Sequence, residues 1–76
     1  MDTELTIQEK IFIVESKIKF QNETLFNYNL DLELHALEEN AGNDEYYDNI
    51  ALFKANAERK VAALTTMLEE LKAASN

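Results

Sequence analysis

The stretch Asn40-Ala41-Gly42-Asn43-Asp44 decides the fold, because it holds the only glycine of a 76-residue chain that has no proline. Glycine readily takes the left-handed backbone conformation that often ends a helix, and Asn43 and Asp44 are favourable caps for a new helix. Asp44, Glu45 and Asp48 suit the start of a second helix, whose dipole favours negative charge there. A single break of this kind predicts two helical segments.

On either side of the break, apolar residues recur every three or four positions, which is the spacing of one helix face. Thr6 and Glu9 have the spacing of a capping box, with Thr3 as an alternative cap. The stripe of the first segment is Ile7, Ile11, Val14, Ile18, Leu25 and Leu32. The stripe of the second is Tyr46, Ile50, Phe53, Ala57, Val61, Leu64, Leu68 and Leu71. We expect one helix near residues 4–40 and another near 44–73, joined by a turn at 41–43.

Residues 26–34 also fit a half-buried strand, because their apolar and polar residues alternate strictly. Two observations favour a continuous helix instead. The helical phase does not slip across Gln21 and Asn22, and a lone strand would have no partner joined to it by a hairpin turn. Asparagine is a poor helix former, so Asn22, Asn27 and Asn29 should mark the softest part of this helix.

Folding the two segments back on each other about Gly42 gives an antiparallel helical hairpin of the coiled-coil kind, all-α and a single domain over residues 1–76. The lengths of the two segments match. The pairs expected across the hairpin are Leu37 with Tyr47, Leu34 with Ile50, Leu30 with Phe53, Phe20 with Leu64, and Ile13 with Leu71.

A second apolar stripe lies roughly 120° around the first helix. A hairpin covers only one stripe, and burying a Leu or Phe side chain stabilises by ~1.5–3 kcal/mol. We therefore expect a second copy to cover this stripe, in a dimer of hairpins that forms a four-helix bundle, or else a partner protein. The stripe comprises Leu5, Phe12, Phe26, Leu30, Leu34 and Leu37, and its predicted interface residues are Phe12, Phe26, Leu30, Leu34 and Leu37.

The charge is polarised along the chain. Residues 21–52 contain eight carboxylates and no Lys or Arg, and these eight equal the whole formal net charge of −8. The predicted turn is therefore an acidic tip, made of Glu38, Glu39, Asp44, Glu45 and Asp48. We do not expect the chain to bind nucleic acid directly, because phosphate binding needs clustered Lys and Arg.

The composition predicts neither catalysis nor a bound cofactor. The chain has one His, no Cys, and only two serines, one in mid-helix and one near the C-terminus. The residues weighed as metal ligands are Asp31, His35, Glu38 and Glu39, whose spacing would place carboxylates on both sides of the imidazole. We prefer a solvated helix face with ordinary side-chain pairs, because the Glu-x-x-His spacing of di-metal bundles is absent.

The chain is expected to be made and kept in the cytoplasm. No apolar run approaches the ~20 residues that cross a bilayer, and Met1-Asp2-Thr3-Glu4 lacks the profile of a signal peptide. The absence of cysteine fits a reducing compartment.

One resemblance spans most of the chain. The run Asn29-Leu30-Asp31-Leu32-Glu33-Leu34, followed by Glu38-Glu39-Asn40-Ala41, a short polar turn and then Lys60-Val61-Ala62-Ala63-Leu64, resembles small uncharacterised helical-hairpin proteins of bacteriophages, especially phages of marine cyanobacteria. The resemblance implies a viral accessory or virion-associated protein. Two functions are expected from different classes: a non-enzymatic interaction or structural protein, and an acidic inhibitor that binds a basic surface of a host protein.

Overall fold

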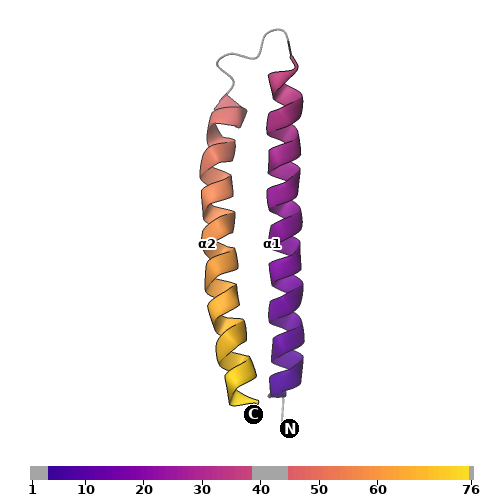
Figure 1. The fold of residues 1–76 in the computed structure, drawn as a ribbon, viewed down its shortest axis with the longest axis vertical. Helices are drawn as coiled ribbons and strands as arrows, with labels where there is room; N and C mark the ends of the chain where they lie inside the picture. Colours follow the sequence, from indigo (N-terminus) through magenta and orange to yellow (C-terminus); the bar gives the residue numbers. More distant parts are fainter. Residues whose placement is uncertain (1–3, 39–44, 76) are drawn as a thin grey trace.

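A computed structural model describes residues 4–38 and 45–75 as two long helices side by side (Figure 1). Helix α1 spans Ile7–Ala36 and helix α2 spans Glu45–Ala74, each 30 residues long. They run antiparallel, so both chain ends lie at one end of a rod that measures 58 × 25 × 16 Å. The all-α helical hairpin predicted from the sequence is confirmed.

The start of α1 is fixed by a capping box. The Glu9 backbone N–H donates to Thr6 Oγ1 at 3.1 Å, and the Thr6 backbone N–H donates to Glu9 Oε1 at 2.8 Å. Both bonds satisfy donors that have no partner inside the helix. The helix therefore begins at Ile7, three residues later than the expected residue 4, with Thr6 as its cap.

Helix α1 continues without a break through residues 21–34, so the alternative strand over 26–34 is wrong. The Thr24 hydroxyl donates to the Phe20 carbonyl at 2.9 Å, which is a bond within the helix. The helix ends at Ala36, and the N–H groups of Leu37 and Glu38 bond back to Leu34 and His35. Residues 39–44, and with them the whole of the predicted turn at 41–43, lie outside the described part of the chain.

Helix α2 matches the expected 44–73 closely. Glu45 and Asp48 occupy its first turn and Lys72 its last. Each of these charges is opposite in sign to the partial charge of the helix dipole at that end, which is the favourable arrangement. Lys72 Nζ also lies 3.9 Å from Glu15 Oε2, which links the last turn of α2 to α1.

The two helices meet along a seam in which positions alternate at spacings of four and three, the heptad spacing of a coiled coil. Ile50 is fully buried, and Ala57 and Ile11 are also buried. All remaining seam positions are half-buried. The seam of α1 is Ile7, Ile11, Val14, Ile18, Gln21, Leu25, Tyr28, Leu32 and His35. The seam of α2 is Tyr47, Ile50, Lys54, Ala57, Val61, Leu64, Leu68 and Leu71.

Near the turn, the ring contacts across the hairpin differ from the expected pairs. Tyr47 stacks on His35, with ring centroids 3.5 Å apart, and not on Leu37, which is 81% exposed. Phe53 packs beside Tyr28, with centroids 6.1 Å apart. The expected pair of Leu37 with Tyr47 is therefore wrong. Nearer the chain ends, Phe20 and Leu64 line one hollow between the helices and Ile13 and Leu71 line another, so both of these expected pairs lie close together. The cause is that the seam of α1 follows the strict heptad spacing through Tyr28 and His35.

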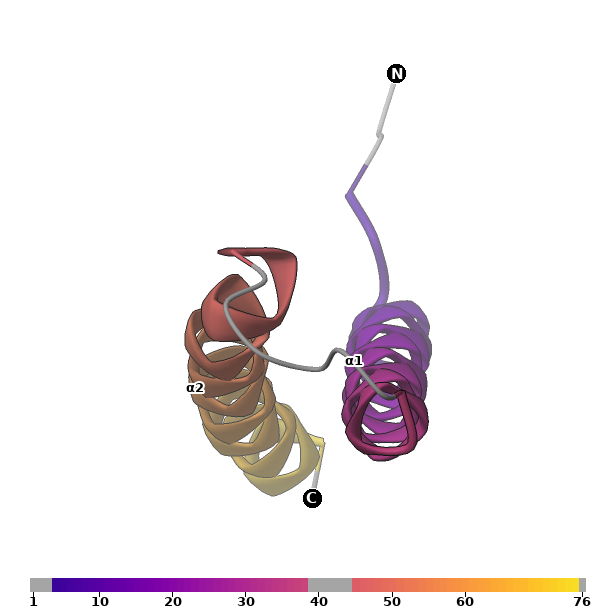
Figure 2. The ribbon, with the colours of Figure 1, turned by 90° about the horizontal axis from the view of Figure 1, so that it is seen from above.

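The two helices do not lie strictly parallel. Seen from above, α1 is viewed almost along its axis while α2 slants away from it (Figure 2). An inclination between packed helices follows from fitting the side-chain ridges of one into the grooves of the other.

Candidate interaction surface

Large apolar side chains that the hairpin leaves exposed gather on α1 and next to its two ends. Among the described residues, eleven large apolar side chains are exposed, and eight of these lie between residues 5 and 37. Those eight are Leu5, Phe12, Ile13, Phe20, Phe26, Leu30, Leu34 and Leu37. Helix α2 contributes only Leu52, Phe53 and Met67. The apolar surface of this hairpin therefore belongs mainly to one helix.

The five residues predicted to form an interface, namely Phe12, Phe26, Leu30, Leu34 and Leu37, are all exposed. We call this set the outer face of α1. Phe12 is 70% exposed and Leu34 is 61% exposed, values that leave most of each side chain in water. An apolar surface of this extent on a soluble monomer usually marks a binding site.

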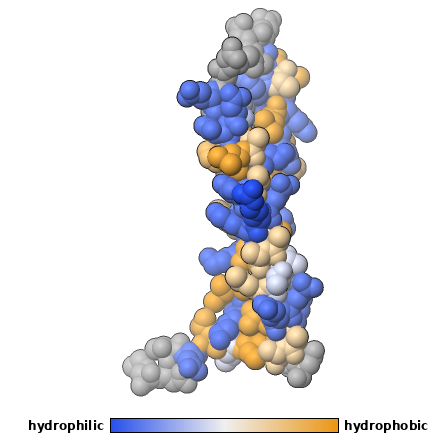
Figure 3. Space-filling model, turned by 90° about the vertical axis from the view of Figure 1, so that its left-hand side faces the viewer, coloured by the Kyte–Doolittle hydropathy of each residue, from blue (hydrophilic) through white to orange (hydrophobic). Residues whose placement is uncertain are grey.

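The outward surface of α2 differs in character. Seen from the side of α2, hydrophilic side chains form a band across the middle of the molecule (Figure 3). Exposed residues of α2 between its seam positions are mostly polar, charged or alanine: Asn49, Ala51, Asn56, Glu58, Arg59, Lys60, Ala62, Ala63, Thr65, Thr66, Glu69 and Glu70. The larger part of the exposed apolar surface that a partner could bury therefore lies on α1.

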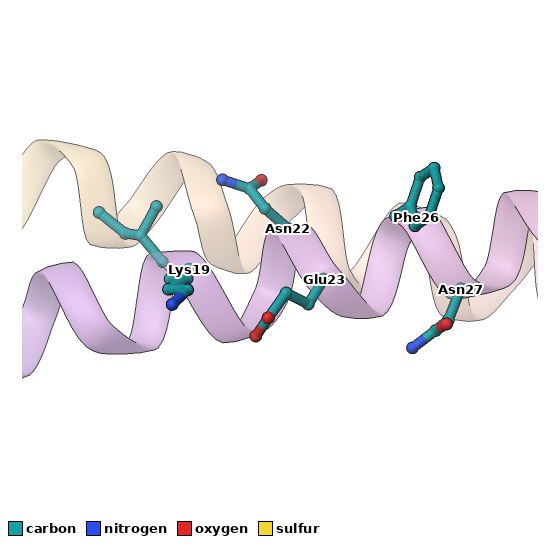
Figure 4. A pocket seen from close by; sticks show the side chains of 6 residues that line it. Lys19, Asn22, Glu23, Phe26 and Asn27 are labelled. Atoms are coloured by element: carbon teal, nitrogen blue, oxygen red, sulfur yellow. The ribbon is translucent and has the colours of Figure 1, made fainter.

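Phe26 stands at the edge of a shallow open depression on α1 (Figure 4). All of its lining residues come from α1: Ile18, Lys19, Asn22, Glu23, Phe26 and Asn27. The Phe26 ring projects away from the helix axis, with polar side chains along the other edge. This hollow is open and lined by one helix only, so we assign it no separate ligand.

The acidic tip is described only in part. Glu38, Glu45 and Asp48 are exposed, whereas Glu39 and Asp44 lie outside the described residues. The described part of the tip therefore offers three solvent-facing carboxylates around the turn end of the hairpin.

His35 does not lie on a solvated face, and that part of the sequence interpretation is wrong. Its side chain is only 12% exposed, because it occupies a seam position and stacks on Tyr47 with the rings 9° from parallel. Its Nδ1 lies 3.2 Å from Glu38 Oε2, so the expected local pair with a carboxylate is present. The sequence signal that could have revealed this placement is the heptad spacing Tyr28, Leu32 and His35.

The weighed metal ligands do not converge in the described structure. His35 and Glu38 are adjacent, Asp31 lies half-buried one turn earlier, and Glu39 falls outside the described residues. Over residues 4–38 and 45–75, no group of three or more His, Cys, Asp or Glu side chains is placed to hold a metal ion.

Neither described helix is both long and apolar enough to span a membrane. Comparison of the chain with protein-family models, with curated proteins and with solved structures gives no match. The function must therefore be argued from the surface itself.

Proposed function

We propose that this chain is a non-enzymatic interaction protein that self-associates through the outer face of α1, as a dimer of hairpins forming a four-helix bundle. One observation carries the proposal: Phe12, Phe26, Leu30, Leu34 and Leu37 are exposed on one helix of the hairpin. Burial of such side chains on association stabilises by ~1.5–3 kcal/mol each.

The thin core of the hairpin supports the same proposal. Among the described residues, only Ile11, Ile50 and Ala57 are buried. A domain below about 70–80 residues rarely gains more than ~3–5 kcal/mol from one core, and natural small domains add disulfides, metals or association. The chain has no cysteine, so association is the remaining route that uses apolar surface already present.

The resemblance to phage helical-hairpin proteins supports a viral setting for this module, either as part of the particle or as an accessory factor. In that setting the hairpin is a rigid building block, and the outer face of α1 joins it to its neighbour. No reaction is assigned to it.

A second candidate function rests on a different surface. The described carboxylates between residues 22 and 53 are exposed or half-buried, and no Lys or Arg lies among them in the sequence. They are Glu23, Asp31, Glu33, Glu38, Glu45 and Asp48. Such a surface suits an acidic inhibitor that occupies a basic patch on a host protein.

Sedimentation equilibrium of the wild type and of Leu34→Asp tests the leading proposal. The wild type should dimerise, and the substitution should raise the dimer dissociation constant roughly a hundredfold, because it removes one apolar contact from each copy. Thr66→Asp is the matched control, since it adds the same charge on the exposed side of α2. A wild type that is folded and monomeric at high concentration removes the proposal.

A further inference from the structure

Helix α1 carries a second heptad pattern on the side that faces away from α2. Positions 12, 16, 19, 23, 26 and 30 alternate at spacings of four and three, and each lies one or two residues after a position of the seam with α2. All six positions are exposed. We call them the outer seam, which comprises Phe12, Ser16, Lys19, Glu23, Phe26 and Leu30. A heptad stripe of this kind is the packing surface for one more helix.

The outer seam is complementary to itself when it is read in the opposite direction. Positions equally far from residue 21 form three pairs that match in charge, in size or in apolar character: Phe12 with Leu30, Ser16 with Phe26, and Lys19 with Glu23. Two antiparallel helices related by a two-fold axis bring such positions face to face.

We propose that the outer seam binds the outer seam of a second copy, antiparallel and with the two-fold axis at the level of residue 21. The two α1 helices then form the middle of the bundle, and the two α2 helices lie outside them. This inference rests on the proposed self-association and adds its direction and register.

The charged pair selects this arrangement over the others. Lys19 and Glu23 both line the depression in Figure 4, and neither forms an ion pair with another described residue. In the proposed register each lysine meets the glutamate of the other copy, twice in one dimer. A parallel dimer would set Lys19 against Lys19 and Glu23 against Glu23. An antiparallel register shifted by one heptad would set Glu23 against Phe12 or Phe26.

The surface around Ser16 has the shape that this register needs. Ser16 lies between Phe12 and Phe20, and the three line an open hollow of about 320 Å³ on α1. In the antiparallel pair this hollow receives Phe26 of the second copy, whose ring is 63% exposed in the single hairpin. A large side chain opposite a small one is the packing of a knob into a hole. The two-fold axis fills the same hollow on both copies.

One pair beyond these six positions is unfavourable. Glu9 comes level with Glu33 of the second copy. The Glu9 carboxylate accepts the Thr6 backbone N–H at 2.8 Å, so the capping box turns it toward the start of its own helix. Farther out, Leu37 comes level with Leu5 of the second copy, and both are exposed. The main contacts of the dimer therefore lie between residues 12 and 30.

Distances between identical positions of the two copies test both direction and register. The chain has no cysteine, so Gln8→Cys, Asn22→Cys and Asn29→Cys each place one spin label per copy at an exposed, uncharged position. These positions lie on one side of α1, because they are multiples of seven residues apart. With the axis at residue 21, the labels are separated along the helices by about 39, 3 and 24 Å respectively, at 1.5 Å per residue.

Electron paramagnetic resonance should therefore give the shortest distance at position 22 and the longest at position 8. Equal distances at the three positions would show a parallel dimer and overturn the inference. Distances that place the axis one heptad away from residue 21, or at no level of α1, would also overturn it. Each of these results leaves self-association standing, whereas a wild type that is monomeric in sedimentation removes both proposals.

Charge reversal tests the central pair. Lys19→Glu should raise the dimer dissociation constant at least about tenfold at low salt, because each lysine–glutamate pair becomes a pair of glutamates. Glu23→Lys should have the same effect. An equimolar mixture of the two variants should form a mixed dimer, because both of its charged pairs are again of opposite sign. Mixing would not repair a defect confined to the helix of each chain.

The matched control is Arg59→Glu, which changes the net charge as Lys19→Glu does but at an exposed position of α2. It should change the dissociation constant by less than about threefold, because it lies outside the outer seam. A control that weakens the dimer as much as Lys19→Glu, or a mixture that stays monomeric, contradicts the inference.

Discussion

The half of the hairpin near the chain ends and the half near the turn share one backbone geometry but differ in the chemistry of their seam. Near the chain ends the seam is wholly aliphatic: Ile7, Ile11, Val14 and Ile18 face Val61, Leu64, Leu68 and Leu71. Near the turn, polar and aromatic residues interrupt it: Gln21, Tyr28, His35, Tyr47 and Lys54. Aliphatic side chains can exchange neighbours at little cost, whereas stacked rings fit one neighbour only. The difference teaches that the turn half sets the register and the other half adds apolar area.

The largest expected effect comes from Ile50→Ala in the turn half. Ile50 is the one fully buried large side chain described, and truncating such a residue costs about 2–5 kcal/mol. That loss is comparable with the whole stability of so small a core. Urea denaturation followed by circular dichroism should show a variant that is largely unfolded in water. Leu52→Ala, at a position 56% exposed, is the control and should change stability by less than about 0.5 kcal/mol. Equal midpoints for the two variants would contradict the burial of Ile50.

An intermediate effect is expected from the stacked rings that set the register. A double-mutant cycle with His35→Ala and Tyr47→Ala should give a coupling free energy of about 0.5–1.5 kcal/mol, because each ring loses its partner in the single variants. Urea denaturation of the wild type, the two single variants and the double variant measures this coupling free energy. His35→Ala combined with Leu68→Ala, which lies in the other half, should be additive. Coupling of the same size in both cycles would show that the two halves do not differ.

The smallest effect concerns the capping box at the chain-end half. Thr6→Ala should lower stability by about 0.5 kcal/mol, the low end for loss of a helix cap, since it removes the acceptor for the exposed Glu9 backbone N–H. The backbone N–H and then the hydroxyl of Thr6 hold the pKa of Glu9 below its ordinary value. A carboxylate with a lowered pKa contributes stability above its unfolded pKa and loses it as the pH falls through the folded value.

The thermal midpoints of wild type and Glu9→Gln should therefore differ at neutral pH and converge in acid. Glu58→Gln removes the same charge at an exposed position in the middle of α2, away from both helix starts, and serves as the control. A difference that persists unchanged at acid pH would show that the capping box does not depend on the ionised carboxylate.

Much of the fold could be read from the spacing of apolar residues. The stripes through Ile11, Val14 and Ile18 and through Val61, Leu64 and Leu68 lie in the seam as expected, because a period near 3.5 leaves one face that can be buried. The stripe of the second helix was misplaced only at its turn end. There Tyr47 and Lys54 occupy the seam, while Phe53 lies beside it and is 38% exposed.

The candidate surface was predicted in part. The first helix has two apolar stripes and a hairpin gives it one neighbouring helix. The sequence therefore predicted that the hairpin would leave the outer face of α1 uncovered. The groove between the helices that is lined by Lys10, Lys17 and Lys60 did not follow, because its walls come from residues 25 or more positions apart in the sequence. Lys17 and Lys60 look like scattered surface bases until the two helices are placed side by side.

The sequence by itself determined that this chain forms two amphipathic helices, that they break near Gly42, and that its negative charge collects toward one end. Those properties depend on local periodicity, capping and composition. Only the tertiary structure decided the register, the placement of His35 against Tyr47, and the groove that brings Lys10, Lys17 and Lys60 together. The physical reason is that register and grooves depend on which side chains of two distant segments fit each other, and no local pattern encodes that fit.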